Sequence, residues 1–501
     1  MWRGGTDGPG WRGLLVVAAG ACALVLLADL LRWMLVGPLE LGLLDSLLPV
    51  DNRVEAEACL GALLAVAALV AAGGLRWKLG PPALATGLTL AVCLADLRPI
   101  PSGDTAPATL LPFALVRDGQ LTFEGTGLDS PLLPLGHEPL PYFLVRRGER
   151  IASKYSPAVG LLATPIALPA ALGRFDARAP DVAHLGKLAA ALLTALGGGC
   201  VFTASARLVG RPFAAAATAL YVLGTPVLPV LGQSLWLHTG SALGFSLALL
   251  ALTGRAEATW RLGALAGVGV GLAVACRPVM VVLALGFAGA LWRVRPRALG
   301  WMAAATALPV LLLAVYQWRV FGSPLSTGYG AEALEGWSTP LWSGVPGLLL
   351  SPGRGLLVES PVLLLAVGAM LRAGRGASPG WLAPLGLSLA VFVCVMGKWW
   401  AWWGGFSPGN RMLSDALPVL GVALACGLRD AWPHRRLRVP IVGLAAVSVA
   451  TAVTLTFHPL ADPFRLRTMS LEAGGPWVPL SHPLVAMADG LLRPSAPEPV
   501  R

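Results

Sequence analysis

Apolar runs of helical length, separated by shorter polar connections, dominate the chain. A transmembrane helix needs about 20 largely apolar residues, with a lower limit of roughly 17. The pattern therefore predicts an all-α, polytopic transmembrane helical bundle of about thirteen spans. The candidate spans are 13–36, 56–74, 82–98, 183–206, 212–231, 237–254, 261–276, 278–292, 299–316, 356–371, 380–397, 412–428 and 440–457.

Basic residues fall in every second connection between these runs. Cytoplasmic connections of membrane proteins carry an excess of Lys and Arg, so the alternation predicts a cytoplasmic N-terminus and an extracytoplasmic C-terminus. The first run has no small-residue cleavage signature and is expected to remain as a span. The basic connections contain Arg3 and Arg12; Arg76 and Lys78; Arg207 and Arg211; Arg255 and Arg261; Arg293, Arg295 and Arg297; Arg372 and Arg375; and Arg429, Arg435, Arg436 and Arg438.

The alternation holds only if the apolar stretch 157–173, PAVGLLATPIALPAALG, does not cross the membrane. Pro165 and Pro169 interrupt it, which suits a re-entrant or interfacial helix better than a lone lipid-facing span. We therefore expect one long first outer loop of juxtamembrane helices. The predicted organisation is an additional N-terminal transmembrane hairpin (1–78), a core (79–457) with outer loops at 99–182, 317–355 and 398–411, and an extracytoplasmic tail (458–501).

Composition supports a membrane protein. Hydrophobic residues make up 56% of the chain and charged residues 13%, which excludes an ordinary soluble domain of this size. The net charge of +11 is explained by the basic connections, so no nucleic-acid partner is expected. The seven cysteines lie in or beside apolar runs without metal-ligand spacing and predict no disulfide framework. Richness in Arg, Ala, Leu and Gly suggests a bacterial source and hence the inner (plasma) membrane.

Asp104 opens the first outer loop, in SGDTAPATLLPFALVRDGQ, just where a helix leaves the lipid. It is either a polar cap on a helix or a catalytic base.

The third outer loop reads KWWAWWGGFSPGNR. Its tryptophans fit an aromatic belt at the membrane surface, but a belt does not explain the glycines or the terminal Arg411. Glycines allow close backbone approach to a ligand, and an Arg fork at a helix start can hold a phosphate.

An ordered set of motifs resembles the polytopic GT-C glycosyltransferases of bacteria, relatives of the protein O-mannosyltransferases and aminoarabinose transferases. The set spans residues 103–420. It consists of GDTAPATLLPFALVRDG, SKYSPAVGLLATPIALP, QSLWLHTGS, CRP, FGSPLSTGY, SPGRGLLVESPVL and WWGGFSPGNRMLSDALPVL.

The resemblance implies transfer of a sugar from a polyprenyl-phosphate-linked donor to an extracytoplasmic glycan, lipid or protein acceptor, with inversion at the anomeric carbon. It implies that Asp104 is the general base, which takes the proton of the attacking hydroxyl. Expected phosphate-binding residues are Lys154, Arg411, Arg354 and Arg277. Expected sugar or acceptor contacts are Tyr155, His238, Trp403, Gly405, His137 and Glu138.

Several alternatives stay open. His238 fits a hydrogen-bonded interfacial histidine as well as a site residue. Asp104 is not part of an Asp-x-Asp motif, so a divalent metal is compatible with the chain but not implied; Asp118, Glu124 and Glu138 are reserve acidic positions. A transporter or flippase for lipid-linked sugars, or a non-catalytic protein of the same fold, would share the bundle and the basic connections. Charges deep in several spans and inverted repeats would favour the transporter.

Overall fold

The computed structural model describes residues 80–95, 99–100, 102–255, 258–376, 378–405, 407–457, 475–477 and 482–485. The predicted N-terminal hairpin, with its spans 13–36 and 56–74, and most of the predicted tail lie outside the described residues.

The described chain is mostly helical. In the amino-terminal half the helices are α3 (Pro81–Cys93), α4 (Ala106–Asp118), α5 (Ala158–Leu172), α6 (Val182–Val209), α7 (Arg211–Leu223) and α8 (Leu237–Leu252). These are followed by α9 (Thr259–Cys276), α10 (Val281–Val294), α11 (Leu299–Phe321), α12 (Glu332–Glu335), α13 (Leu341–Leu350), α14 (Leu356–Glu359), α15 (Leu364–Ala373), α16 (Leu382–Lys398), α17 (Leu417–Ala431) and α18 (Arg435–Phe457).

The predicted all-α membrane architecture is confirmed. Among the described residues, four helices are long and apolar enough to cross a membrane, in the ranges Val182–Val209, Thr259–Cys276, Pro296–Phe321 and Arg435–Thr456. Several shorter apolar helices accompany them. The number of spans, about thirteen, stays a prediction.

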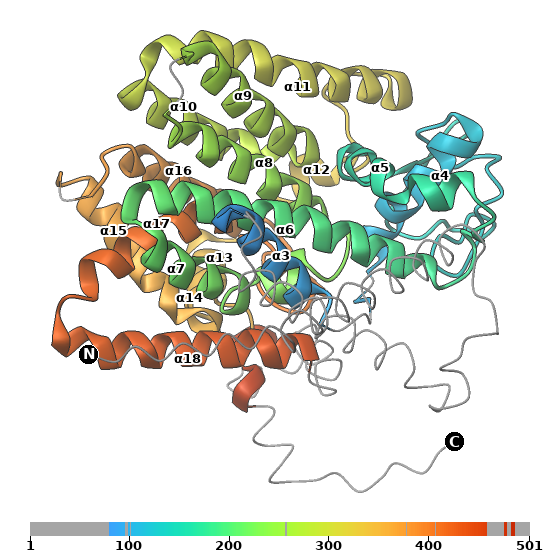
Figure 1. Ribbon diagram of the computed structural model, residues 1–501. Helices are drawn as coiled ribbons and strands as arrows, with labels where there is room; N and C mark the ends of the chain where they lie inside the picture. The colour runs from blue at the N-terminus through green and yellow to red at the C-terminus, as the bar shows by residue number, and fades with distance from the viewer. Residues whose placement is uncertain are drawn as a thin grey trace, which may run out of the picture.

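The helices form a bundle around a buried centre. In Figure 1, α11 and α18 run along opposite edges of the bundle, and the other long helices lie between them. Helix α17 is buried along nearly its whole length, because α6, α7, α8 and α15 all pack against it. In contrast, much of α11 is exposed, and its main neighbour is α9. An apolar helix exposed at the edge of a bundle fits contact with lipid.

Arginine side chains tie the predicted cytoplasmic connections together at one end of the bundle. Each donates to a neighbouring connection rather than to its own helix. The bonds are Arg207 to the Leu250 carbonyl (2.7 Å), Arg295 to the Gly254 carbonyl (2.8 Å), Arg293 to the Gly380 carbonyl (3.1 Å) and Arg372 to Asp430 (3.3 Å). Five successive basic connections therefore share one end, as the charge alternation requires.

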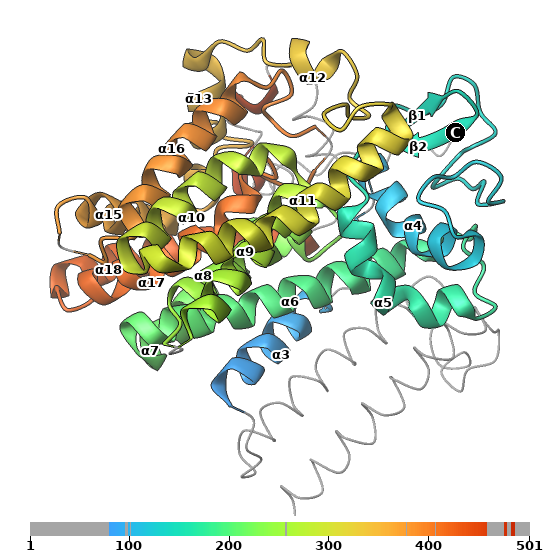
Figure 2. The ribbon, with the colours of Figure 1, turned by 90° about the horizontal axis from the view of Figure 1, so that it is seen from above.

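The first outer loop folds as a unit at the other end of the bundle. Helices α3 and α6 lie side by side, with Thr86 and Thr89 against Gly199 and Gly198. The loop between them has its own apolar core, which includes Phe113, Phe123 and Phe175. Figure 2 shows α4, α5 and a two-stranded hairpin gathered at this end, near the carboxyl end of α11.

Helix α5 coincides with the apolar stretch that the sequence predicts not to cross. Its 15 residues give a length of about 22 Å, less than the ~30 Å hydrocarbon core of a bilayer. Arg117 fixes the end of α5 to the end of α4 by donating to the carbonyls of Ala171 (3.0 Å) and Phe175 (2.8 Å). This attachment to α4 within the first outer loop agrees with a juxtamembrane helix.

Two elements in the outer loops differ from the expectation. The strands β1 (Leu144–Arg147) and β2 (Arg150–Ser153) pair antiparallel inside the first loop, for which the sequence predicts juxtamembrane helices. Gly148, with φ 59°, allows the tight turn between them. Helix α13 lies inside the predicted second outer loop. It packs on α16 so closely that a Cβ on Gly344 would lie 1.9 Å from the Gly397 carbonyl oxygen.

Candidate active site

A cavity of about 540 Å³ opens where the three outer loops meet the ends of the bundle helices. The first loop contributes Asp104, Tyr142, Lys154 and Tyr155; the second Tyr329, Glu332 and Trp337; the third Trp399, Trp400, Gly405 and Arg411. The ends of bundle helices add Trp236, His238 and Arg277, and α11 adds the side chains of Leu313, Tyr316 and Phe321. One wall is therefore polar and charged and another is apolar.

Asp104 lies in a single turn of 3-10 helix, Gly103–Thr105, directly before α4. Ser102 caps this turn: its hydroxyl accepts from the Asp104 amide (3.4 Å), and the Thr105 hydroxyl accepts from the Ser102 amide (3.2 Å). This reciprocal capping satisfies amides at the helix start. The sequence SGDT thus fixes the backbone of Asp104, and its side chain, only 12% exposed, points into the cavity.

The Asp104 carboxylate has three partners. Its Oδ1 accepts hydrogen bonds from the hydroxyls of Tyr142 (2.8 Å) and Tyr155 (2.5 Å), and its Oδ2 forms an ion pair with Arg411. Burial raises the pKa of Asp104, but the Arg411 charge and these hydrogen bonds outweigh it, so the net pKa is lowered. The carboxylate is ionised and well stabilised, which makes it a weak base while all three partners stay in place.

Arg411 reaches Asp104 from the third outer loop. Its guanidinium also lies over the Trp236 ring, 4.6 Å from the centroid. Gly404, with φ 83°, lets the backbone pass close to this side chain, since a Cβ there would lie 3.0 Å from Arg411 Cγ. Arg354 stabilises the same loop: its side chain is fully buried and donates a hydrogen bond to the Gly405 carbonyl (3.3 Å). Arg354 does not line the cavity.

Glu332 of the second outer loop joins all three outer loops at the cavity, through Lys154 of the first and Trp400 of the third. Lys154 forms an ion pair with Glu332 of α12 and lies 4.8 Å from the centroid of the Tyr329 ring. The indole of Trp400 donates to the other oxygen of Glu332 (3.0 Å). Burial raises the pKa of Tyr329 to about 12, so this phenol stays neutral and can donate. Glu332 thus binds one residue from each neighbouring loop.

His238 and Arg277 form a second charged group at the cavity, with Asp415 behind them. His238 Nδ1 lies 2.9 Å from Asp415 Oδ2 and 3.0 Å from Arg277 Nη1, and Arg277 forms an ion pair with Asp415. Because the Asp415 carboxylate only accepts, the Nδ1–H tautomer is the one that donates to it, and Nδ1 then cannot accept from Arg277. This tautomer leaves Nε2 of His238 as an acceptor.

Three of the expected contact residues lie away from the cavity. His137 is exposed, and Glu138 forms an exposed ion pair with Arg146. Trp403 packs against Trp400 and Trp402, at centroid distances of 6.0 and 5.9 Å, and helps to build the third loop. In the part of the chain that the structure describes, no three His, Cys, Asp or Glu side chains are grouped to hold a metal ion.

Several residues at the cavity were not identified from the sequence, namely Tyr142, Tyr316, Tyr329, Trp236, Glu332 and the role of Asp415 as a partner. One signal could have found the tyrosines. The whole chain has 5 tyrosines, and four of them, Tyr142, Tyr155, Tyr316 and Tyr329, line this one cavity. A rare residue type that recurs in the outer loops is a usable indication of a site.

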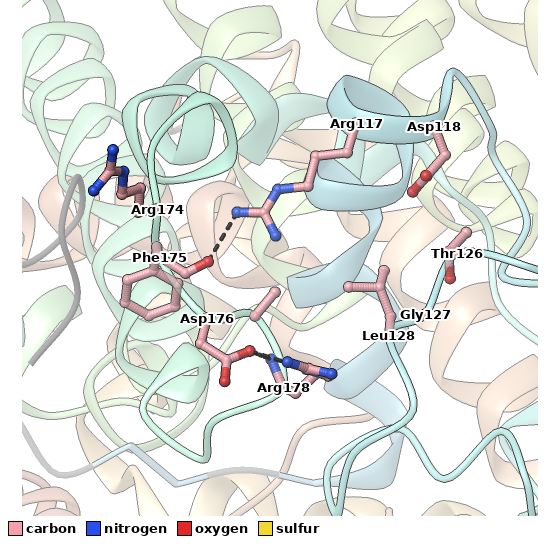
Figure 3. A pocket seen from close by; sticks show the side chains of 10 residues that line it. Arg117, Asp118, Thr126, Gly127, Leu128, Arg174, Phe175, Asp176 and Arg178 are labelled. Carbon is pink, nitrogen blue, oxygen red and sulfur yellow. Dashed lines mark hydrogen bonds and ion pairs between the residues drawn. The ribbon is translucent and has the colours of Figure 1, made fainter.

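A second hollow, of about 390 Å³, lies in the first outer loop (Figure 3). Arg117, Arg174 and Arg178 line it, together with Asp118 and Asp176. Arg178 pairs with Asp176 at 3.2 Å, and Arg117 is engaged by backbone carbonyls of the segment after α5. These contacts stabilise the loop, and the hollow has a single aromatic residue, Phe175, in its lining, whereas the larger cavity has many.

No protein-family model and no curated protein matches the chain. Among solved structures, it is similar to the crystal structure of ArnT from Cupriavidus metallidurans bound to undecaprenyl phosphate. The sequence identity is 14%, the TM-score is 0.49, and the alignment covers 78% of this chain and 69% of ArnT.

Proposed function

We propose that this membrane protein is a glycosyltransferase of the GT-C type. It transfers a sugar from a polyprenyl-phosphate donor to an acceptor hydroxyl in the cavity, with inversion. The observation that carries the proposal is the composition of one cavity: a buried carboxylate, cationic side chains, several aromatic rings and an apolar wall from an edge helix. Each part matches one part of the reactants.

The apolar wall suits the lipid. Leu313, Tyr316 and Phe321 belong to α11, whose other faces are largely exposed. A prenyl chain lying in the bilayer can reach the cavity along this helix, so that only the phosphate and sugar enter the polar part. Cations stabilise the negative charge that develops on a leaving phosphate. We assign this role to Arg411 and Lys154, with Arg277 next to them; Arg354 holds the third loop in place.

The aromatic side chains suit the sugar. Tyr155, Tyr329 and Trp399 form a chain of edge-to-face contacts, at 5.8 and 5.9 Å between centroids. Such rings present both apolar faces and, in the tyrosines, a hydroxyl group. Gly405 allows close approach from the third loop. His238, held by Asp415, offers an acceptor nitrogen to a sugar or acceptor hydroxyl.

Asp104 is the proposed base. The acceptor oxygen forms a bond to the anomeric carbon, the bond from that carbon to the phosphate oxygen breaks, and the electron pair leaves with the lipid phosphate. The acceptor proton goes to Asp104. Positioned general bases of this kind typically contribute about 10²–10⁴-fold in rate.

Asp104→Asn should therefore lower transfer by about 10²–10⁴-fold while the protein still binds a lipid phosphate. The full chain in nanodiscs would be assayed with a panel of radiolabelled polyprenyl-phosphate sugars and membrane-extract acceptors. Asp176→Asn, which removes a carboxylate from the exposed pair with Arg178, is the control and should keep wild-type activity. Full transfer by Asp104→Asn would refute the base assignment. Movement of the lipid-linked sugar across vesicles without transfer would instead support a transporter.

A further inference from the structure

Asp104 and Arg411 are bonded to each other, although the proposed reaction needs each of them for a different reactant. Asp104 must accept a proton from the acceptor hydroxyl, and Arg411 must hold the donor phosphate. Both side chains are largely buried, with exposed fractions of 12% and 16%. Their ion pair is therefore little screened by solvent. While it persists, neither group is fully available.

The guanidinium of Arg411 has capacity for a further anion. Nη1 is engaged by Asp104, whereas Nε is buried and has no hydrogen-bond partner within the described part of the chain. A buried donor without a partner is costly unless a ligand satisfies it. A phosphate has more acceptor oxygens than a single carboxylate oxygen and can engage a guanidinium by two parallel bonds.

We propose that the donor phosphate competes with Asp104 for Arg411, so that donor binding releases Asp104 to act as the base. This inference rests on the proposed function. In the donor-free protein, Asp104 occupies Arg411 as an internal counter-ion. Once the phosphate takes the guanidinium, Oδ2 of Asp104 is free, and Oδ1 stays held by Tyr142 and Tyr155. The base is thus activated without losing its position.

The exchange makes the reaction ordered. Before the donor is bound, an acceptor hydroxyl or a water molecule at Asp104 meets a carboxylate that Arg411 has neutralised. After the donor is bound, Oδ2 is available to take the acceptor proton while the electron pair departs with the phosphate. Activation of the nucleophile therefore waits for the donor, which limits wasteful hydrolysis.

The test measures binding of a polyprenyl phosphate, without sugar, to the full chain in nanodiscs of zwitterionic lipid. Asp104→Asn removes the competing charge and should bind the lipid phosphate about tenfold more tightly than the wild type, although its transfer activity is strongly reduced. Arg411→Gln should bind more weakly. In the Arg411→Gln background, Asp104→Asn should bring no further gain, because the competition runs through Arg411.

Asp176→Asn is the matched control. It removes a carboxylate from an arginine pair of the same outer loop, at the separate hollow (Figure 3), and should change the affinity less than twofold. Variants are compared only if they elute and melt like the wild type, and Asp104→Ser replaces Asp104→Asn if the latter does not fold.

The competition is refuted if Asp104→Asn binds the lipid phosphate no more tightly than the wild type. It is also refuted if Asp104→Asn raises the affinity by the same factor in the Arg411→Gln background as in the wild type. In both cases the wild type still binds the lipid phosphate, and the proposed function survives. Absence of lipid-phosphate binding in the wild type and in every variant overturns the proposed function and the competition together.

Discussion

Tyr142 and Tyr155 restrain the chemistry of Asp104 in addition to its charge partner Arg411. Their hydroxyls both donate to Oδ1, and a hydrogen bond to the charged form of a carboxyl lowers its pKa. Burial and the neighbouring carboxylate raise the pKa of Tyr155, so its phenol stays protonated and keeps donating. The two tyrosines are therefore positioning residues for the proposed base.

Tyr155→Phe should move the acid limb of the transfer rate to higher pH by about 0.5–1 unit. A hydrogen bond to a charged group contributes roughly 1 kcal/mol or more, and one pKa unit corresponds to about 1.4 kcal/mol. The folded pKa of Asp104 is lowered, so losing a donor raises it and more of the carboxyl is protonated at a given acidic pH. At pH values within the acid limb, Tyr155→Phe should therefore be slower than the wild type, and at higher pH the two rates should be nearly equal.

The measurement is the pH dependence of kcat/KM for the wild type, Tyr155→Phe and Tyr316→Phe. Tyr316 also lines the cavity but is not bonded to Asp104, so its variant should keep the wild-type limb. An acid limb that is the same in Tyr155→Phe and the wild type would argue against Asp104 as the titrating base.

The residues themselves were partly predictable. Asp104, Lys154, Tyr155, His238 and Arg411 stand out in the sequence because charged, aromatic and glycine-rich motifs are unusual in so apolar a chain, and the structure brings all five to one cavity. Their pairings were not predictable. Nothing local indicates that Lys154 pairs with Glu332, since both sit in exposed-looking polar loops 178 positions apart.

At the scale of elements, glycines set how closely the helices that carry the site can approach. Where α8 and α9 cross, a Cβ on either Gly244 or Gly269 would lie 2.4 Å from the carbonyl oxygen of the other. Small residues allow such close backbone contact between membrane helices. Because His238 begins α8 and Arg277 follows α9, this crossing fixes the spacing of the second charged group.

Gly269→Ala should lower the free energy of unfolding by about 1–3 kcal/mol, the usual cost of overpacking a tight contact. Gly300→Ala is the matched control: it also replaces a helical glycine, but no atom lies within 4 Å of its Cβ position. It should be neutral or slightly stabilising, as alanine favours helix. Thermal unfolding of purified protein in detergent compares the two. Equal melting temperatures for both variants would contradict the tight crossing.

The element positions show what hydrophobic pattern can and cannot predict. Long apolar runs such as 183–206 and 261–276 became helices with ends within a few residues of those expected, since a helix in lipid satisfies its own backbone. The hairpin of β1 and β2 and the short helix α13 escaped prediction. Both are too short for a span, and packing against neighbours decides their form.

At the scale of the molecule, charge divides the bundle into two ends. Arginines that bond neighbouring connections gather at one end, and the cavity opens at the other. Of the predicted tail, the described Pro476 accepts a hydrogen bond from Gly353 (3.0 Å), and Trp477 lies 6.3 Å from Trp402 by ring centroids. This part of the tail thus lies with the outer loops, as the topology requires.

Which end faces the cytoplasm is predicted by the excess of basic residues. Leu334→Cys, 85% exposed in α12 beside the cavity, should react with a membrane-impermeant maleimide in intact cells. Arg375→Cys, in an exposed basic connection, should react only after the membrane is permeabilised. Both substitutions are made in a background without the native cysteines. Labelling of both positions from the same side would refute the topology.

The sequence by itself determined the membrane class, the helical architecture and the shared end of the basic connections. These properties follow from local composition: apolar length satisfies the bilayer, and charge near each helix end sets orientation. Only the tertiary structure decided which polar groups meet. Asp104 and Arg411 are 307 positions apart, and their pairing depends on a capped turn, a glycine-rich loop and a stacked tryptophan acting together. A hydropathy pattern reflects whether each segment lies in lipid or in water, whereas the chemistry of the cavity depends on contacts between segments that are distant in the sequence.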